Sequence, residues 1–155
     1  MVLAERIGIP LPRGGEFVVT TMVVATAMLY LPTSAAILAA GLGTLTGETF
    51  ARKPWYRLLF NVSPVATATG AASLVWRRLW GDGELIPHPD RPEMIPYALA
   101  ALSIYYLLNT GLVSGVLAIS ARKNFFRIWR ENHRGVFMPH FGMQIMGVLF
   151  AGALV

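Results

Sequence analysis

The sequence predicts an all-α fold, a polytopic transmembrane helical bundle of four to five membrane helices and one short basic interfacial helix. Of the 155 residues, 55% are hydrophobic and only 14% are charged, whereas a soluble domain carries about a quarter charged residues. The charges are clustered, so that long charge-free runs are left between them. A soluble enzyme, a disordered tail and a nucleic-acid-binding domain are excluded. The whole chain, 1–155, is predicted to be a single integral membrane domain.

Four runs contain no Asp, Glu, Lys or Arg, and their lengths are 31, 19, 28 and 21 residues. Each is at or above the length that crosses a bilayer. The runs are Phe17–Gly47, Leu58–Trp76, Met94–Ala121 and Gly135–Val155.

The first run is too long for one upright helix, and Pro32 offers a break inside it. Two interpretations stay open: one strongly kinked span, or two shorter helices over Phe17–Tyr30 and Ser34–Thr46. Small residues on this and later runs allow close packing between helices. The pairs expected at such contacts, inside the bundle first and with partners second, are Gly43 and Gly47, Ala66 and Gly70, and Gly111 and Gly115.

Between the last two runs, the segment Arg122–Arg134 predicts a short basic amphipathic helix. At helical spacing, four cations share one face: Lys123, Arg127, Arg130 and Arg134. Such a helix suits the headgroup layer of a membrane, where anionic lipid is the expected partner.

The distribution of basic residues predicts an orientation. If Phe17–Gly47 crosses once, the linkers Glu48–Arg57 and Arg122–Arg134 share one side and carry most of the Lys and Arg. The positive-inside rule then places both in the cytoplasm and both termini outside. If the first run is a re-entrant pair, the N-terminus moves to the cytoplasm.

The polar residues inside the runs are mostly neutral, which argues against a pump or an ion-coupled transporter. They favour hydrogen bonds between helices, or alternatively a shared intramembrane pocket for a lipid-like or aromatic ligand. The candidate ligand-binding residues are Asn61, Asn109, Thr110, His140 and Gln144. His140 is read as a hydrogen-bonded structural residue; ligation of a pigment or haem is the alternative. His88 and His133 are expected in loops, so that no pair of deep histidines forms.

Catalytic chemistry is not indicated. The chain has no Cys, and no zinc-protease, nucleotide-binding, hydrolase or paired-carboxylate pattern occurs. We therefore expect no enzyme activity, no catalytic residues and no protein-bound metal, and the sequence specifies no cofactor.

Several segments, in order, resemble the N-terminal membrane domain that precedes HD-GYP or GGDEF output domains in many bacteria. They are Ile9–Gly15, the Pro32 break with its small-residue helix, Leu59–Asn61, Leu108–Thr110 and Ile128–Asn132. The resemblance implies a compact membrane bundle that senses a ligand, with Asn61 and Asn109 as its recurring polar positions. The family usually has one more apolar helix at each end, which this sequence lacks, so it is not expected to signal by cyclic-dinucleotide chemistry itself. Two explanations stay open: a partner chain that holds both ends, or a sequence that is a fragment of a longer protein.

Two functions follow as expectations. The first is a non-catalytic accessory or scaffold subunit that packs with other integral membrane proteins in a bacterial membrane complex, of photosynthetic or respiratory type. The alternative is a membrane-embedded sensing or ligand-binding module of the HD-GYP/GGDEF-associated type. In both, the protein is a multi-pass protein of the bacterial inner membrane that contacts anionic lipid and no nucleic acid.

Overall fold

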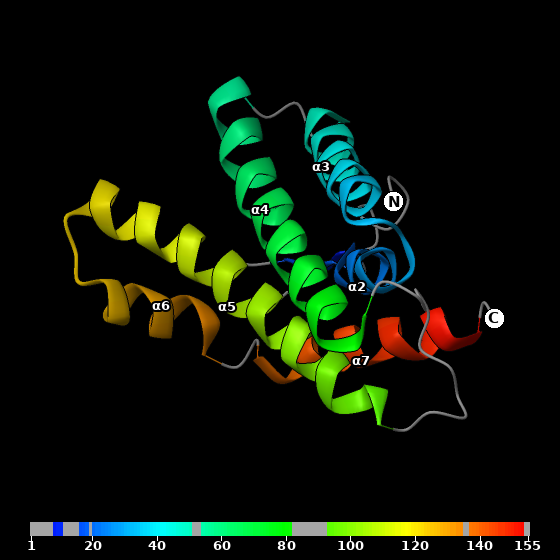
Figure 1. The fold of residues 1–155 in the computed structure, drawn as a ribbon. Helices are drawn as coiled ribbons and strands as arrows, with labels where there is room; N and C mark the ends of the chain where they lie inside the picture. Colours follow the sequence, from blue (N-terminus) through cyan, green and yellow to red (C-terminus); the bar gives the residue numbers. More distant parts are fainter. Residues whose placement is uncertain are drawn as a thin grey trace.

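In the computed structural model the chain is helical, apart from one short ribbon. The structure describes residues 8–10, 16–18, 20–50, 54–81, 93–134 and 137–153. In this part lie β1 (Gly8–Pro10), β2 (Glu16–Val18), α2 (Thr20–Tyr30), α3 (Thr33–Phe50), α4 (Trp55–Trp80), α5 (Met94–Ala121), α6 (Phe125–His133) and α7 (Phe137–Ala153) (Figure 1). The all-α class is confirmed. Most of the N-terminal arm and of the loop between α4 and α5 lies outside the described residues.

The first charge-free run forms two helices, as one of the two interpretations has it. α2 ends at Tyr30 and α3 begins at Thr33, because Pro32 has no N–H for the helical ladder. The run starts later than predicted. Phe17 belongs to β2, which pairs antiparallel with β1 in the register Ile9 to Phe17. The aromatic and β-branched residues at 17–19 favour a strand over a helix.

In the described part of the chain, fewer helices than predicted are long and apolar enough to cross a membrane. Among its helices, α4 and α5 meet both criteria, against the four to five spans expected. The break at Pro32 leaves α2 with 11 residues, and α7 has 17. α3 has 18 residues but carries Glu48 and several threonines in its second half. The lengths of the charge-free runs therefore overestimate the number of helices that are long enough to span a membrane.

α4 lies at the centre of the fold, with α3 along one side and α5 along another (Figure 1). The main core contains Met28 and Leu29 of α2, Trp76 of α4 and Leu102 of α5, all fully buried or nearly so. Small residues of α4, such as Ala68 and Ala72, let the helices approach closely.

Side-chain hydrogen bonds hold the break between α2 and α3 against α4. Pro32 interrupts the ladder beside the carbonyl of Leu31, and the Arg77 guanidinium donates to this oxygen at 2.8 Å. Beside it, the hydroxyls of Thr33 and Ser73 are 3.0 Å apart. Both contacts pair polar groups that would be costly to leave without a hydrogen bond in an apolar environment.

α7 packs mainly along α2 and contacts α5 only slightly. Gly147 is the point of closest approach: a Cβ added there would lie 2.7 Å from the carbonyl oxygen of Met22 and 2.8 Å from the Cβ of Ala25. The Thr26 hydroxyl donates to the Gly147 carbonyl at 3.0 Å. Close backbone contact and this hydrogen bond together join the two helices.

The predicted small-residue pairs differ in their surroundings. A Cβ on Gly70 would lie 2.9 Å from the side chain of Ile37, so α3 and α4 are close there. Gly43 is buried and Gly47 and Ala66 are half-buried. Around Gly111 and Gly115, by contrast, an added Cβ would meet no described neighbour within 4 Å outside the local turns of its own helix. Gly147, which no pair included, makes a closer contact than Gly70 does.

We expect Gly147→Ala to destabilise the bundle, because the methyl group would meet backbone atoms of α2 that cannot rotate away. The expected loss is about 1–3 kcal/mol, measured as thermal unfolding in mild detergent. Gly142→Ala is the matched control on the same helix, since its Cβ would meet nothing within 4 Å. Equal melting temperatures for the two variants would contradict the assigned contact.

Candidate functional site

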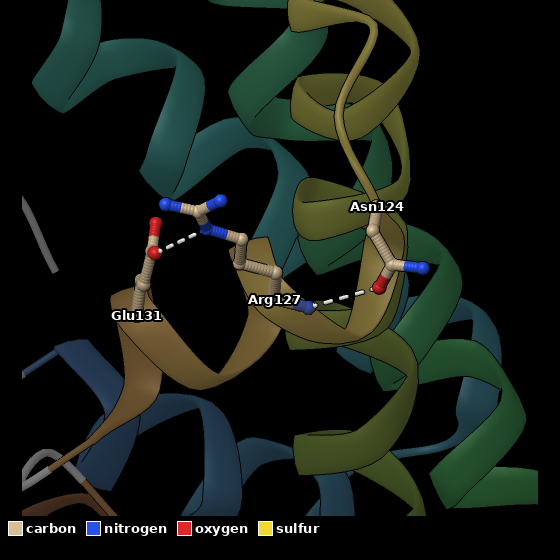
Figure 2. A network of polar contacts seen from close by, with 3 residues as sticks. All are labelled: Asn124, Arg127 and Glu131. Atoms are coloured by element: carbon tan, nitrogen blue, oxygen red, sulfur yellow. Dashed lines mark hydrogen bonds and ion pairs between the residues drawn. The ribbon is translucent and has the colours of Figure 1, made fainter.

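The basic segment after α5 folds back along that helix as α6, as Figure 1 shows. The turn is set by Arg122, which ends α5 in the left-handed conformation (φ 51°) while its N–H and that of Lys123 bond to carbonyls of the last turn of α5. Asn124 then caps α6, since its side-chain oxygen accepts from the N–H of Arg127 at 3.2 Å (Figure 2). The predicted helix is thus present, between Phe125 and His133.

Three side chains attach α6 to α5. Ile128 is buried between the helices. The indole Nε1 of Trp129 donates to the hydroxyl of Thr110 at 3.1 Å, and the His133 ring lies 3.4 Å from the hydroxyl of Ser114. The attachment is therefore partly apolar and partly polar.

A pocket of about 700 Å³ opens where α5, α6 and α7 meet. Its volume is within the range that proteins use for drug-sized ligands. Rings dominate its lining, and two arginines stand among them. The lining residues are Ser103, Tyr106, Leu107, Trp129, Arg130, His133, Arg134, Phe137 and Phe141.

Tyr106 connects the walls of this pocket. Its ring lies 5.4 Å from that of Phe137 in an edge-to-face arrangement, 6.2 Å from that of His133 and 5.1 Å from that of His140, centroid to centroid. Phe137 in turn stacks on Phe141. Aromatic pairs of this kind fix ring positions, so one α5 side chain orients groups from both α6 and α7.

The charge around the pocket is positive. Arg130 and Arg134 line it and are exposed, as are Lys123 and Arg127 on the predicted basic face. Glu131 lies on α6 but not in the lining, and it forms an exposed ion pair with Arg127 at 2.9 Å (Figure 2). The hydrogen bond from Arg127 lowers the pKa of the Glu131 carboxyl, which keeps this pair charged at neutral pH.

Three of the five predicted ligand-binding residues lie beside the pocket, although none lines it. Thr110 receives the Trp129 indole, and His140 stacks against Tyr105. Gln144 is fully buried and its amide donates to the Leu102 carbonyl at 3.4 Å.

The two asparagines are placed differently. Asn61 is on α4, which contributes no residue to the lining, and Asn109 is a half-buried residue of α5 outside it.

Sequence reasoning missed most of the lining and misplaced one histidine. His133 was expected in a loop; it is half-buried in the last turn of α6 and faces Tyr106. The signal available in the sequence was the seven-residue separation of His133 and His140, together with the aromatic residues around them. In the described residues no three His, Cys, Asp or Glu side chains gather as metal ligands.

Several hydroxyls in the helices are occupied within their own helix. Ser63, Ser103 and Thr110 each donate to the carbonyl four residues earlier at 2.7 Å. This is how apolar surroundings satisfy Ser and Thr. The ionic and aromatic groups, rather than these hydroxyls, therefore define what the pocket can recognise.

A helical bundle with two helices long and apolar enough to cross a membrane and a basic amphipathic helix at its edge is typical of a membrane-associated domain. The family model MASE9 matches residues 3–152, nearly the whole chain. The chain belongs to this family, which comprises membrane-associated domains of sensory type. No curated protein and no solved structure matches it.

We expect the docking of α6 on α5 to weaken as the pH falls. Burial lowers the pKa of His133 below its ordinary value near 6.5, opposed in part by a hydrogen bond to the backbone of Thr110. The state in which α6 packs on α5 therefore binds fewer protons than a state in which α6 is detached. The stability of the packed state declines as the pH falls below about 6.5. Because the chain has four tryptophans, the emission of Trp129 is taken as the difference between the spectra with and without Trp129→Phe, and the change is measured as its red shift between pH 7.5 and pH 5. His133→Phe should flatten this profile; an unchanged profile in that variant would assign the effect to another group.

Proposed function

We propose that this protein is a non-enzymatic sensory module, embedded as a multi-pass domain in the bacterial inner membrane, whose ligand binds in the pocket between α5, α6 and α7. One observation carries the proposal: the pocket walls belong to two parts of the fold that are supported separately. α6 is attached to α5, whereas α7 is carried by α2 and contacts α5 only slightly. A ligand bound in a pocket at such a junction acts directly on the relative position of the two parts.

The outer surface of the bundle supports the membrane placement. Large apolar side chains are exposed along α3, α4, α5 and α7, among them Leu38, Leu59, Leu107 and Leu149. Exposed apolar surface on this scale marks contact with lipid or protein. α4 and α5 are long and apolar enough to span a membrane. In the proposed arrangement they cross it, the shorter apolar helices α2 and α7 are embedded against them, and α6 lies in the headgroup layer.

Ligand binding is coupled to helix position through the rings of the pocket. A ligand that contacts Phe137 and Phe141 on one side and Trp129 on the other bridges the two parts and favours one spacing between them. α7 is the element that changes position, because its contact with α5 is slight. Its displacement is the signal.

The output of this signal is of the HD-GYP or GGDEF type, in a further domain or a partner protein. Membership of a sensory-type family and the sequence resemblance support this assignment. An accessory subunit of a larger complex is the other function considered. Neither the family nor any contact of the described residues favours it, so the sensory function is proposed first.

We expect Leu107→Trp to abolish retention of the native ligand. Leu107 lines the pocket, and a bulkier indole at this position fills space that the ligand needs. Leu108→Trp is the matched control: it adjoins Leu107 and is also exposed, but it is not part of the lining. The measurement is mass spectrometry of small molecules bound to the full chain after extraction from its native membrane in mild detergent.

The same extraction separates the two functions. A small molecule present in the wild-type and Leu108→Trp proteins, and missing from Leu107→Trp, supports the sensor. Stoichiometric partner proteins with no bound small molecule in any of the three proteins would support the subunit and contradict the sensor.

A further inference from the structure

The pocket combines an apolar interior with an uncompensated positive edge. Arg130 and Arg134 both line it, and no carboxylate of the described residues does. The nearest acid along α6, Glu131, is engaged by Arg127 (Figure 2). Two arginines that line the same space, with no acidic partner among the described lining residues, are suited to bind an anion from outside the chain.

The interior is built for hydrocarbon rather than for a free ion. Leu107, Phe137 and Phe141 extend the lining along α5 and α7, and both helices also carry exposed apolar side chains. Tyr106 closes the pocket against α7. A small inorganic anion would occupy only the edge and would leave this surface without a contact.

From this arrangement we propose that the ligand is a single-chain anionic amphiphile of the bilayer, whose carboxylate or phosphate head binds Arg130 and Arg134 and whose chain lies between α5 and α7. The inference rests on the proposed function and specifies the ligand of the same pocket. The head is held at the level of the basic helix, where anionic lipid headgroups lie. A guanidinium binds such heads through paired charge-assisted hydrogen bonds.

His133 completes the polar edge. It lines the pocket beside the two arginines, and its pKa is lowered by burial, so that at neutral pH the ring is uncharged and contributes one donor or acceptor. The two permanent charges of the arginines therefore provide the discrimination between an anionic and a neutral head.

The test uses the full chain in phosphatidylcholine nanodiscs, titrated with oleic acid or oleoyl lysophosphatidic acid and followed by native mass spectrometry. We expect one saturable site for at least one of these probes. Oleyl alcohol, which has the same chain and no charge, should bind at least about tenfold more weakly, the factor that one lost charge-assisted hydrogen bond corresponds to. Millimolar inorganic phosphate should not displace the bound amphiphile.

Two double variants remove equal charge from the same segment. Arg130→Gln with Arg134→Gln should weaken the binding of the anionic probe at least about tenfold. Arg122→Gln with Lys123→Gln removes two exposed cations that do not line the pocket, and its affinity should stay within about twofold of wild type. An equal loss of affinity in the two double variants would show that the effect comes from general surface charge, and it would overturn the inference.

The remaining outcomes separate this inference from the proposed function. If oleyl alcohol binds as well as both acids, and Leu107→Trp blocks it, the anionic specificity is wrong and the pocket function stands. If phosphate competes with the same affinity as the amphiphile, the site is one for a free anion and the inference is wrong. If no probe distinguishes wild type from Leu107→Trp and the native extract holds no ligand, both are wrong.

Discussion

The hydrogen bond from Arg77 to the carbonyl oxygen of Leu31 joins the break between α2 and α3 to the end of α4. Pro32 interrupts the helix there, and an interrupted ladder in apolar surroundings leaves polar backbone groups that water cannot reach. Arg77 lies near the end of α4, the central helix. The contact that pairs the Leu31 carbonyl therefore also fixes the position, relative to α4, at which α2 ends and α3 begins. The neighbouring hydroxyls of Thr33 and Ser73 support it from the start of α3.

The position of α2 then decides the position of α7, because α7 rests mainly on α2 through Gly147 and Thr26. α6 is placed independently, by the turn at Arg122 and by its contacts with α5. The pocket lies between α6, which is placed by α5, and α7, which is placed by α2. The rigidity of one pocket wall relative to the other therefore depends on the small contact between α5 and α7. A sensory site needs walls that can move relative to each other, whereas a purely structural cavity does not.

The sequence predicted those features that depend on local chemistry. The break at Pro32 follows from a missing N–H, and the helix around Arg127 and Arg130 follows from the spacing of charges and apolar residues. It singled out Gly70, which packs closely on α3, but it also chose Gly111 and Gly115, which face open space, and it omitted Gly147, which makes the tightest contact printed for a described glycine. A spacing of small residues identifies a face that can pack, but only the tertiary arrangement decides which face meets a neighbour.

The same limit applied to the site. Thr110, His140 and Gln144 were singled out because polar residues are costly in apolar runs, and they do gather beside the pocket. Phe137 and Phe141 were missed because a phenylalanine in an apolar run carries no local signal of function. His133 was misplaced because its role depends on α6 folding back onto α5, a turn set by Arg122 in a conformation that a sequence pattern does not reveal.

The buried polar atoms of α7 indicate why movement would occur at this junction rather than elsewhere. The Nε2 atom of His140 and the Oε1 atom of Gln144 are buried with no hydrogen-bond partner in the described part of the chain, and such an atom costs about 1–3 kcal/mol. Both residues are on α7 and lie against α5, through Tyr105 and Leu102 respectively. The hydrogen bonds of Thr26 and Trp129 pair polar groups at the α2–α7 and α5–α6 contacts, whereas the α5–α7 contact is small and leaves these two atoms of α7 unpaired. Under the proposed function, a ligand that brings α5 and α7 to a different spacing therefore works against only a small contact.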